Sequence, residues 1–234
     1  MASFLLIHGS WHGGWCWERL TPILRERGHE VIAVDLPGHG DDDSPAWRVT
    51  AADYSETIRA AADRCEREPI LVGHSMGGLA ITRAAADAPE LFSQLVYLCA
   101  WVPLGAITLI RLMRADRETL VPTGATLGWS CIGMRADRAP AIFYGECAEA
   151  DAAWAIAKLR PDPIRPLLGS LRPREIKLPR TYIKCTKDRA IPIAMQRELI
   201  NRGRFDHVET LNTDHSPFLS APAELAEILD RTLR

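Results

Sequence analysis

Short apolar runs alternate with longer amphipathic segments along the first hundred residues. The runs FLLIH at 4–8 and VIAV at 31–34 have the length and the branched side chains of buried strands. Between them, three apolar side chains of the segment 16–27 fall on one face of a predicted helix, and Gly28 is placed to end it. A strand, a helix and a second strand in this order indicate a βαβ unit and a parallel sheet.

The same alternation continues after the second strand. Thr50 and Asp53 have the spacing of a helix N-terminal cap, which predicts a helix from Thr50 to about residue 66. The apolar run ILVGH leads directly to Ser75, and a segment rich in helix formers follows it. The next strand, LVYLCA, is predicted at 95–100.

The pattern lapses over 101–177, where no clear strand is found and proline and arginine are scattered through weak helical segments. It returns with strands at 180–186 and 207–211, a helix near 193–201 and a last helix over about 222–233. We therefore predict an α/β fold with an inserted segment.

Length and composition favour one soluble globular unit. The chain has 234 residues, of which 47% are apolar and 25% charged, which excludes intrinsic disorder. The predicted core consists of residues 1–100 and 178–234, and residues 101–177 form a small helical cap between its two parts.

The charge and the hydropathy of the chain limit the kinds of partner that it is expected to bind. The 28 basic and 30 acidic side chains give a net charge of −2 without a basic stripe, so no nucleic acid is expected. The longest apolar stretch, 95–110, covers 16 residues and contains Pro103 and Gly105. It is shorter than the roughly 20 residues that cross a bilayer, so no membrane partner is expected.

Cysteine usage and the first residues indicate a cytoplasmic protein. The six cysteines are dispersed and are expected to be reduced. They form no CxxC pair and no cluster at metal-ligand spacing, so no metal site is predicted. The apolar start, Phe4 to Ile7, is too short for a signal peptide.

The strongest chemical signal is Gly73-His74-Ser75-Met76-Gly77. A serine flanked by glycines two residues away on each side, entered by a strand and left by a helix, fits a nucleophile elbow. The turn presents the Ser75 hydroxyl above the sheet, and the amides that follow it face developing negative charge. Ser75 is therefore the predicted nucleophile.

A serine nucleophile needs a histidine base and an acid that orients it. Among seven histidines, His215 lies in a polar loop after the last strand, where a parallel sheet gathers catalytic groups. Asp188 lies in the loop after the preceding strand, and Asp214 is its rival. Adjacent residues seldom face one another, so Asp188 is preferred and Asp214 is interpreted as a turn cap.

The loop after the first strand, His8-Gly9-Ser10, is expected to supply the second oxyanion donor. Gly9 allows the backbone to approach the substrate closely, and the N–H groups of Ser10 and Met76 are the predicted pair of donors. His8 and His12 are interpreted as residues that brace this loop rather than as catalytic groups.

Three parts of the chain contain sequence segments that are typical of a known family. The start has FLLIHGSWHGGWCWERL and GHEVIAVDLPGHG, the middle has ILVGHSMGG and LVYLCAWVP, and the end has DRAIP and DHSPF. With these segments the chain resembles the α/β-hydrolase superfamily, most closely a bacterial-type esterase of the branch that holds plant methylesterases, salicylic-acid-binding esterase and α-hydroxynitrile lyases. The resemblance covers nearly the whole chain. It implies an α/β-hydrolase fold, a mostly parallel sheet flanked by helices.

The resemblance also implies roles. Ser75, Asp188 and His215 match the family triad, and Ser10 and Met76 match its oxyanion positions. The lyases of this branch have threonine at the position of Gly9 and lysine directly after the catalytic histidine, where this chain has Ser216. The resemblance therefore favours an esterase that cleaves small to medium carboxylic esters through an acyl-enzyme. A lyase and a non-catalytic small-ligand receptor remain the alternatives.

The cap is shorter than in the plant members and does not align with them, so it indicates little about the substrate. Trp129 is the main candidate for an apolar substrate pocket, although it could equally belong to the core, and Trp101 and Trp11 are weaker candidates, for which the core is favoured. The expected partner is a small-molecule ester, no metal or organic cofactor is expected, and a homodimer is left open.

Overall fold

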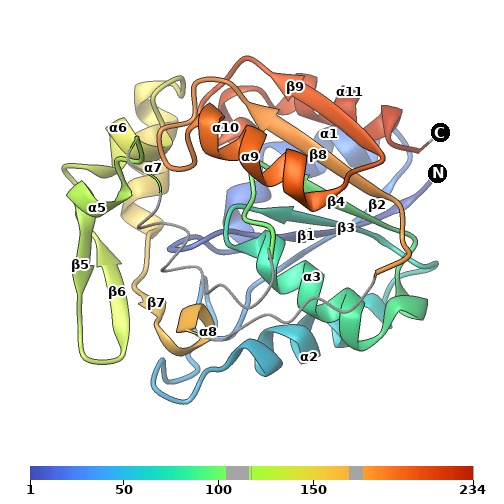
Figure 1. Ribbon diagram of the computed structural model, residues 1–234, viewed down its shortest axis with the longest axis horizontal. Helices are drawn as coiled ribbons and strands as arrows, with labels where there is room; N and C mark the ends of the chain where they lie inside the picture. The colour runs from blue at the N-terminus through green and yellow to red at the C-terminus, as the bar shows by residue number, and fades with distance from the viewer. Residues whose placement is uncertain (104–115, 117, 169–175, 234) are drawn as a thin grey trace.

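Six parallel strands form the central sheet of the computed structural model, which describes residues 1–103, 116, 118–168 and 176–233 (Figure 1). Their order is β2-β1-β3-β4-β8-β9, so β1 lies next to the edge strand β2, and after β2 the chain crosses to the other side of β1 and continues outward from there. The strands are β1 (Ser3–Ile7), β2 (Glu30–Val34), β3 (Ile70–His74), β4 (Gln94–Leu98), β8 (Arg180–Cys185) and β9 (His207–Leu211).

Both faces of the sheet are buried, which explains its continuous apolar runs. Alternate side chains of a strand point to opposite faces. Phe4 and Leu6 accordingly join one hydrophobic cluster, while Leu5 and Ile7 join another. The first cluster is covered by η1 (Gly14–Trp17), α1 (Leu20–Glu26), α10 (Pro217–Ser220) and α11 (Pro222–Arg231). The second is covered by α2 (Ala51–Ala62), α3 (Gly77–Asp87) and α9 (Ile193–Gly203), and η2 (Pro89–Leu91) follows α3.

Local signals set the ends of these helices as the sequence predicts. The Thr50 hydroxyl accepts a hydrogen bond from the Asp53 amide, and the Asp53 carboxylate accepts one from the Thr50 amide. This reciprocal pair satisfies two backbone donors that a helix start leaves free. Gly28 follows α1 with a φ of +83°, a conformation that other residues rarely adopt. The helix predicted to reach residue 66 ends earlier, at Ala62.

The segment between β4 and β8 carries the largest correction to the predicted fold. No strand was expected there, yet three short strands form an antiparallel sheet, with a hairpin that extends away from the core (Figure 1). The strands are β5 (Ala125–Leu127), β6 (Cys131–Met134) and β7 (Asp162–Pro163). Strands of two to four residues have too few alternations to give a sequence pattern, so only tertiary pairing reveals them.

Helices complete this segment: α5 (Val121–Gly124), α6 (Ala139–Phe143), α7 (Glu149–Lys158) and α8 (Arg165–Leu168). All six strands of the parallel sheet lie within the ranges predicted for the core, and the three short strands lie within the range predicted for the cap. Residues 104–115, 117 and 169–175 of that predicted cap lie outside the described residues. Among the helices that the structure describes, none is long and apolar enough to cross a membrane.

Candidate active site

Ser75 occupies a sharp turn between β3 and α3. Its φ is +53°, a strained conformation for a residue with a side chain. The turn closes tightly, because a Cβ atom on Gly73 would lie 2.8 Å from the carbonyl of Gly77. A Cβ atom on Gly77 would lie 2.6 Å from the His8 carbonyl oxygen on the neighbouring loop. Both glycines of the motif are therefore needed for the turn to form against β1.

His215 and Asp188 form a buried pair. The Nδ1 atom of His215 lies 2.7 Å from Oδ2 of Asp188, and both side chains are almost completely buried. The other oxygen of Asp188, Oδ1, accepts hydrogen bonds from the amides of Ala190 at 2.7 Å and Ile191 at 2.8 Å. These amides fix the carboxylate, which in turn fixes the ring orientation of His215 and leaves its Nε2 atom free for the reaction.

Asp214, the alternative candidate for the partner of His215, binds other groups. It accepts hydrogen bonds from the amides of Glu146 at 2.8 Å and Ser216 at 3.1 Å, and from the Ser220 hydroxyl at 2.8 Å. It therefore organises the turn that carries His215 and joins that turn to the segment between β4 and β8.

One small cavity brings the predicted residues together at the carboxyl ends of the strands. Ser75, His215 and Ser10 line it with a mainly apolar wall: Trp11, Trp101, Val121, Phe143, Ala190 and Ile191. No hydrogen bond joins the Ser75 hydroxyl to His215 in this structure, as is frequent before substrate binds. The cavity thus combines the predicted nucleophile, an oriented imidazole and an apolar wall.

Two backbone amides remain available beside Ser75. The hydrogen bonds among the described residues include none that uses the N–H of Ser10 or of Met76. Ser10 lines the cavity, and Met76 is the N-cap of α3, at the positive end of the helix dipole. This is the arrangement that stabilises an oxyanion.

His12 and His8 brace the first loop in the neutral state. His12 Nδ1 lies 2.7 Å from the carbonyl oxygen of Ser10 and must donate, so its Nε2 accepts from the Tyr144 hydroxyl at 2.8 Å. Burial, with a smaller contribution from the neighbouring His215, lowers the pKa of His12 to about 4. His8 Nδ1 donates to the Gly9 carbonyl at 2.8 Å, and burial lowers the pKa of His8 as well.

His74 supports the loop that carries His215. Its Nε2 atom donates to the backbone carbonyl of His215 at 2.8 Å, and the two rings lie 4.5 Å apart between centroids. Burial, followed by the charge of His215, holds the pKa of His74 well below its usual value. A neutral His74 places no positive charge beside His215, the predicted base.

We expect acid to destabilise the protein because of His12. Its pKa is about 4 in the folded chain, against 6.5 for an ordinary histidine, so the unfolded chain binds the extra proton between these values. The free energy of unfolding should therefore fall as the pH drops from about 6.5 to 4, by about 3 kcal/mol from His12 alone. Urea unfolding at pH 7.5 and 4.5 measures this difference. His12→Gln should show a smaller pH dependence, and an unchanged one would contradict the assignment.

Gly9 has no room for a side chain. A Cβ atom there would lie 2.7 Å from Cβ of Ser75 and 2.8 Å from Nδ1 of His74. We expect Gly9→Ala to displace the loop and lower kcat/KM for a short-chain aryl ester by about 100-fold, since small misplacements of catalytic groups have effects of this size. Gly145→Ala is the matched control, because its Cβ would meet nothing within 4 Å. Equal activity of the two variants would refute this role of Gly9.

The prediction that Trp129 lines the substrate pocket needs correction. It lies in the turn between β5 and β6 and is 89% exposed, so it does not line the described cavity. Trp11 and Trp101, the weaker candidates, are buried and do line it. Phe143 on α6 also lines the cavity and was missed, because nothing in its short apolar helix distinguishes it from a core residue.

Within the described part of the chain, one group of side chains has the composition of a metal site: His74, Cys99 and His215. The Cys99 thiol and His74 Nε2 both lie against the His215 carbonyl, at 3.5 and 2.8 Å. Burial raises the pKa of Cys99 well above its usual value, which disfavours the thiolate that a metal needs. These side chains fit the support of His215 better than they fit a metal.

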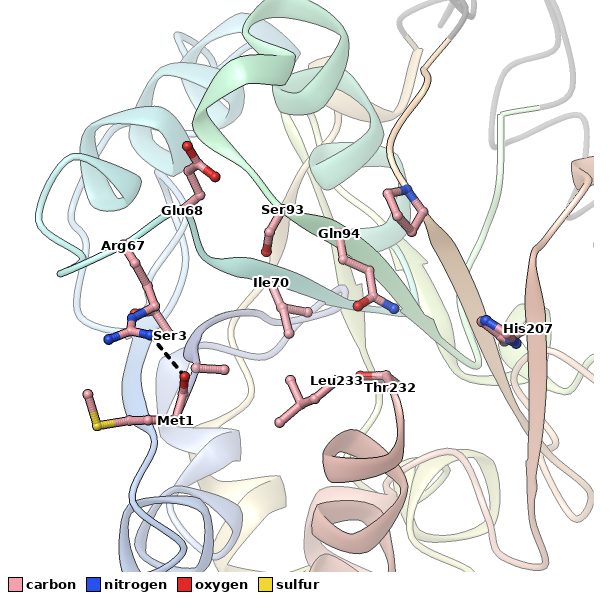
Figure 2. A pocket seen from close by; sticks show the side chains of 12 residues that line it. Met1, Ser3, Arg67, Glu68, Ile70, Ser93, Gln94, His207, Thr232 and Leu233 are labelled. Carbon is pink, nitrogen blue, oxygen red and sulfur yellow. Dashed lines mark hydrogen bonds between the residues drawn. The ribbon is translucent and has the colours of Figure 1, made fainter.

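A broader hollow of about 520 Å³ opens at the opposite edge of the sheet, where the strands begin (Figure 2). Ser3, Ile70, Gln94 and His207, the first residues of four strands, line it. Arg67 there donates to the carbonyl oxygen of Met1. The hollow contains no serine paired with an oriented histidine, so the smaller cavity at the carboxyl ends is the candidate active site.

Residues 4–228 match the model of the alpha/beta hydrolase family. The chain is 31% identical over 249 residues to Methylesterase 18 of Arabidopsis thaliana, with 97% of this chain and 95% of that protein covered. It is 30% identical over 247 residues to a pyrethroid hydrolase of Sphingobium wenxiniae, with 98% and 86% covered.

Solved structures show the same similarity. The crystal structure of a methylesterase from Arabidopsis superposes with a TM-score of 0.85 at 28% sequence identity, and covers 100% of this chain and 99% of that one. The similarity therefore extends over the parallel sheet and over the segment between β4 and β8.

Proposed function

Because the chain belongs to the α/β-hydrolase family, the fold predicted from the sequence is confirmed, and we propose that the protein is a carboxylic ester hydrolase with Ser75 as its nucleophile. The observation that carries the proposal is the cavity shared by Ser75 and His215, in which Asp188 holds Nδ1 of His215 at 2.7 Å. The names of the relatives, methylesterase and pyrethroid hydrolase, support ester substrates.

The proposed reaction is acyl transfer. Nε2 of His215 removes the Ser75 proton while Oγ attacks the ester carbonyl, and Asp188 stabilises the imidazolium that forms. The amides of Ser10 and Met76 bind the oxyanion of the tetrahedral intermediate. His215 then donates the proton to the leaving alcohol, which gives an acyl-enzyme. Water, activated by the same imidazole, releases the acid and restores Ser75.

Small to medium esters with an apolar part suit this site best. The described wall of the cavity consists of aromatic and aliphatic side chains and offers no fixed cation to a charged substrate. The six cysteines are all free, which supports the cytoplasm as the compartment in which the enzyme acts.

Position 216 argues against the lyase alternative. Ser216 follows His215, and its hydroxyl is buried without a hydrogen-bond partner among the described atoms. An uncharged hydroxyl at this point offers no ammonium group to a departing cyanide. Release of cyanide from mandelonitrile that depends on His215 would revive the lyase.

Activity-based labelling tests the proposal directly. A fluorophosphonate should add one group to the wild-type chain, located at Ser75 by peptide mass spectrometry, and the labelled protein should lose activity on a panel of methyl and aryl esters. Ser93→Ala, an exposed serine at the opposite edge of the sheet, should label normally. A protein that binds small ligands tightly but neither labels nor turns over esters would be a receptor rather than an esterase.

A further inference from the structure

The loop that carries the Ser10 amide is held by the segment between β4 and β8. Trp11, directly after Ser10, has a φ of +64°, which is strained for a tryptophan. Its amide donates to Oδ1 of Asp162 at 2.7 Å, and its indole Nε1 donates to the carbonyl of Ile132 at 2.8 Å. Its own carbonyl accepts from the amide of Arg160 at 3.0 Å. Every polar group of Trp11 is thus bound by that segment.

Two successive peptide planes at Ser10 are fixed in this way. In the first plane, the Gly9 carbonyl accepts from His8 Nδ1 at 2.8 Å, and the Ser10 N–H, on the opposite side of this trans peptide, points the other way. In the second plane, the Ser10 carbonyl accepts from His12 Nδ1 at 2.7 Å, while the Trp11 N–H donates to Asp162. The orientation of the oxyanion donor therefore depends on both planes.

Asp162 is an unusual residue for this position. Its side chain is 1% exposed, and a buried carboxylate is costly unless it is well paired. Oδ1 accepts both the Trp11 amide and His39 Nε2, the latter at 2.6 Å, while Oδ2 has no partner among the described residues. The pairing of β6 with β7 places Asp162 opposite Ile132, so two neighbouring strands present one acceptor each to the two donors of Trp11.

We infer that Asp162 is a positioning residue for the oxyanion hole. This inference rests on the proposed function. The carboxylate touches no reacting atom; it holds the Trp11 amide, which keeps Ser10 in the geometry that aims its N–H at the cavity. The short sheet β5–β7 is then part of the catalytic machinery, because it carries the group that sets the oxyanion donor (Figure 1).

Asp162→Ala and Asp162→Asn test the inference, with Asp137→Ala on the exposed part of the same segment as the control. The readout is the affinity for an aryl trifluoromethyl ketone, whose adduct with Ser75 carries an oxyanion, against the affinity for the matching aryl methyl ketone, which binds without one. Removing the carboxylate should weaken the first affinity by about 100-fold, the size of effect seen when one oxyanion donor is lost. The affinity for the methyl ketone and the KM of the ester should change by less than about threefold. The kcat should fall in parallel with the affinity for the trifluoromethyl ketone.

The asparagine variant keeps an acceptor for the Trp11 amide but loses the charge, so it should retain most of the affinity, within about tenfold of the wild type. Melting temperatures will show whether each variant folds. If the alanine variant does not fold, the asparagine variant still tests the inference. Equal losses of affinity for both ketones in folded variants, or no loss, would overturn the inference. If instead the wild type neither binds the trifluoromethyl ketone covalently nor hydrolyses esters, the proposed function itself has failed.

Discussion

Replacing Ser75 by alanine is expected to lower kcat for a short-chain aryl ester by about 10⁴- to 10⁶-fold, the range observed when a triad serine is removed. The loss should appear in kcat rather than in KM, since the cavity wall that binds the substrate is unchanged. Alanine also keeps a Cβ atom, so the strained turn at a φ of +53° gains no conformational freedom that could confuse the result. What remains should be the contribution of binding and of the two oxyanion amides alone.

Steady-state kinetics on purified protein measure this loss, with burst titration to count active sites. Ser216→Ala is the matched control: this serine is also buried, it follows His215 directly, and its hydroxyl has no partner among the described atoms. It should stay within about threefold of the wild type, because a hydroxyl that makes no hydrogen bond contributes little. Retention of more than about 1% of kcat by Ser75→Ala would exclude Ser75 as the nucleophile.

Asp188→Asn is expected to lower kcat by about 10⁴-fold, as for other triads in which the tautomer of the histidine is reversed. Oδ1 of Asp188 accepts two backbone amides, so the asparagine oxygen will occupy that place. Its NH2 group then faces Nδ1 of His215. That nitrogen must become an acceptor, the proton moves to Nε2, and the imidazole can no longer remove a proton from Ser75.

Asp214→Asn separates this effect from a general loss of a buried carboxylate near the site. Its hydrogen-bond donors come from its own turn and from Glu146 and Cys147, not from His215. We expect it to lower the free energy of unfolding by about 1–3 kcal/mol, measured with urea, while kcat stays within about tenfold. The opposite pattern, with a larger loss of kcat in Asp214→Asn than in Asp188→Asn, would make Asp214 the third member of the triad.

The chain by itself determined the parallel sheet, the helix starts and the sharp turn that carries the predicted nucleophile. Those features depend on neighbours a few residues apart: alternation along β1, the Thr50–Asp53 cap of α2, and the crowding that requires Gly73 and Gly77 around Ser75. The spacing of side chains along the chain determines short-range geometry of this kind, which is why sequence patterns predict it.

The sequence already favoured Asp188 over Asp214 as the partner of His215, but only the tertiary structure decided the contacts that leave no sequence pattern. It placed Asp188 at 2.7 Å from His215 and joined Asp214 to the amide of Glu146. It also exposed Trp129, paired strands of two to four residues, and carried Asp162 to an amide 151 positions distant. The physical reason is that loops from different strands are placed by the packing of the whole sheet. The chain fixes each loop's residues, and the fold fixes which of them touch.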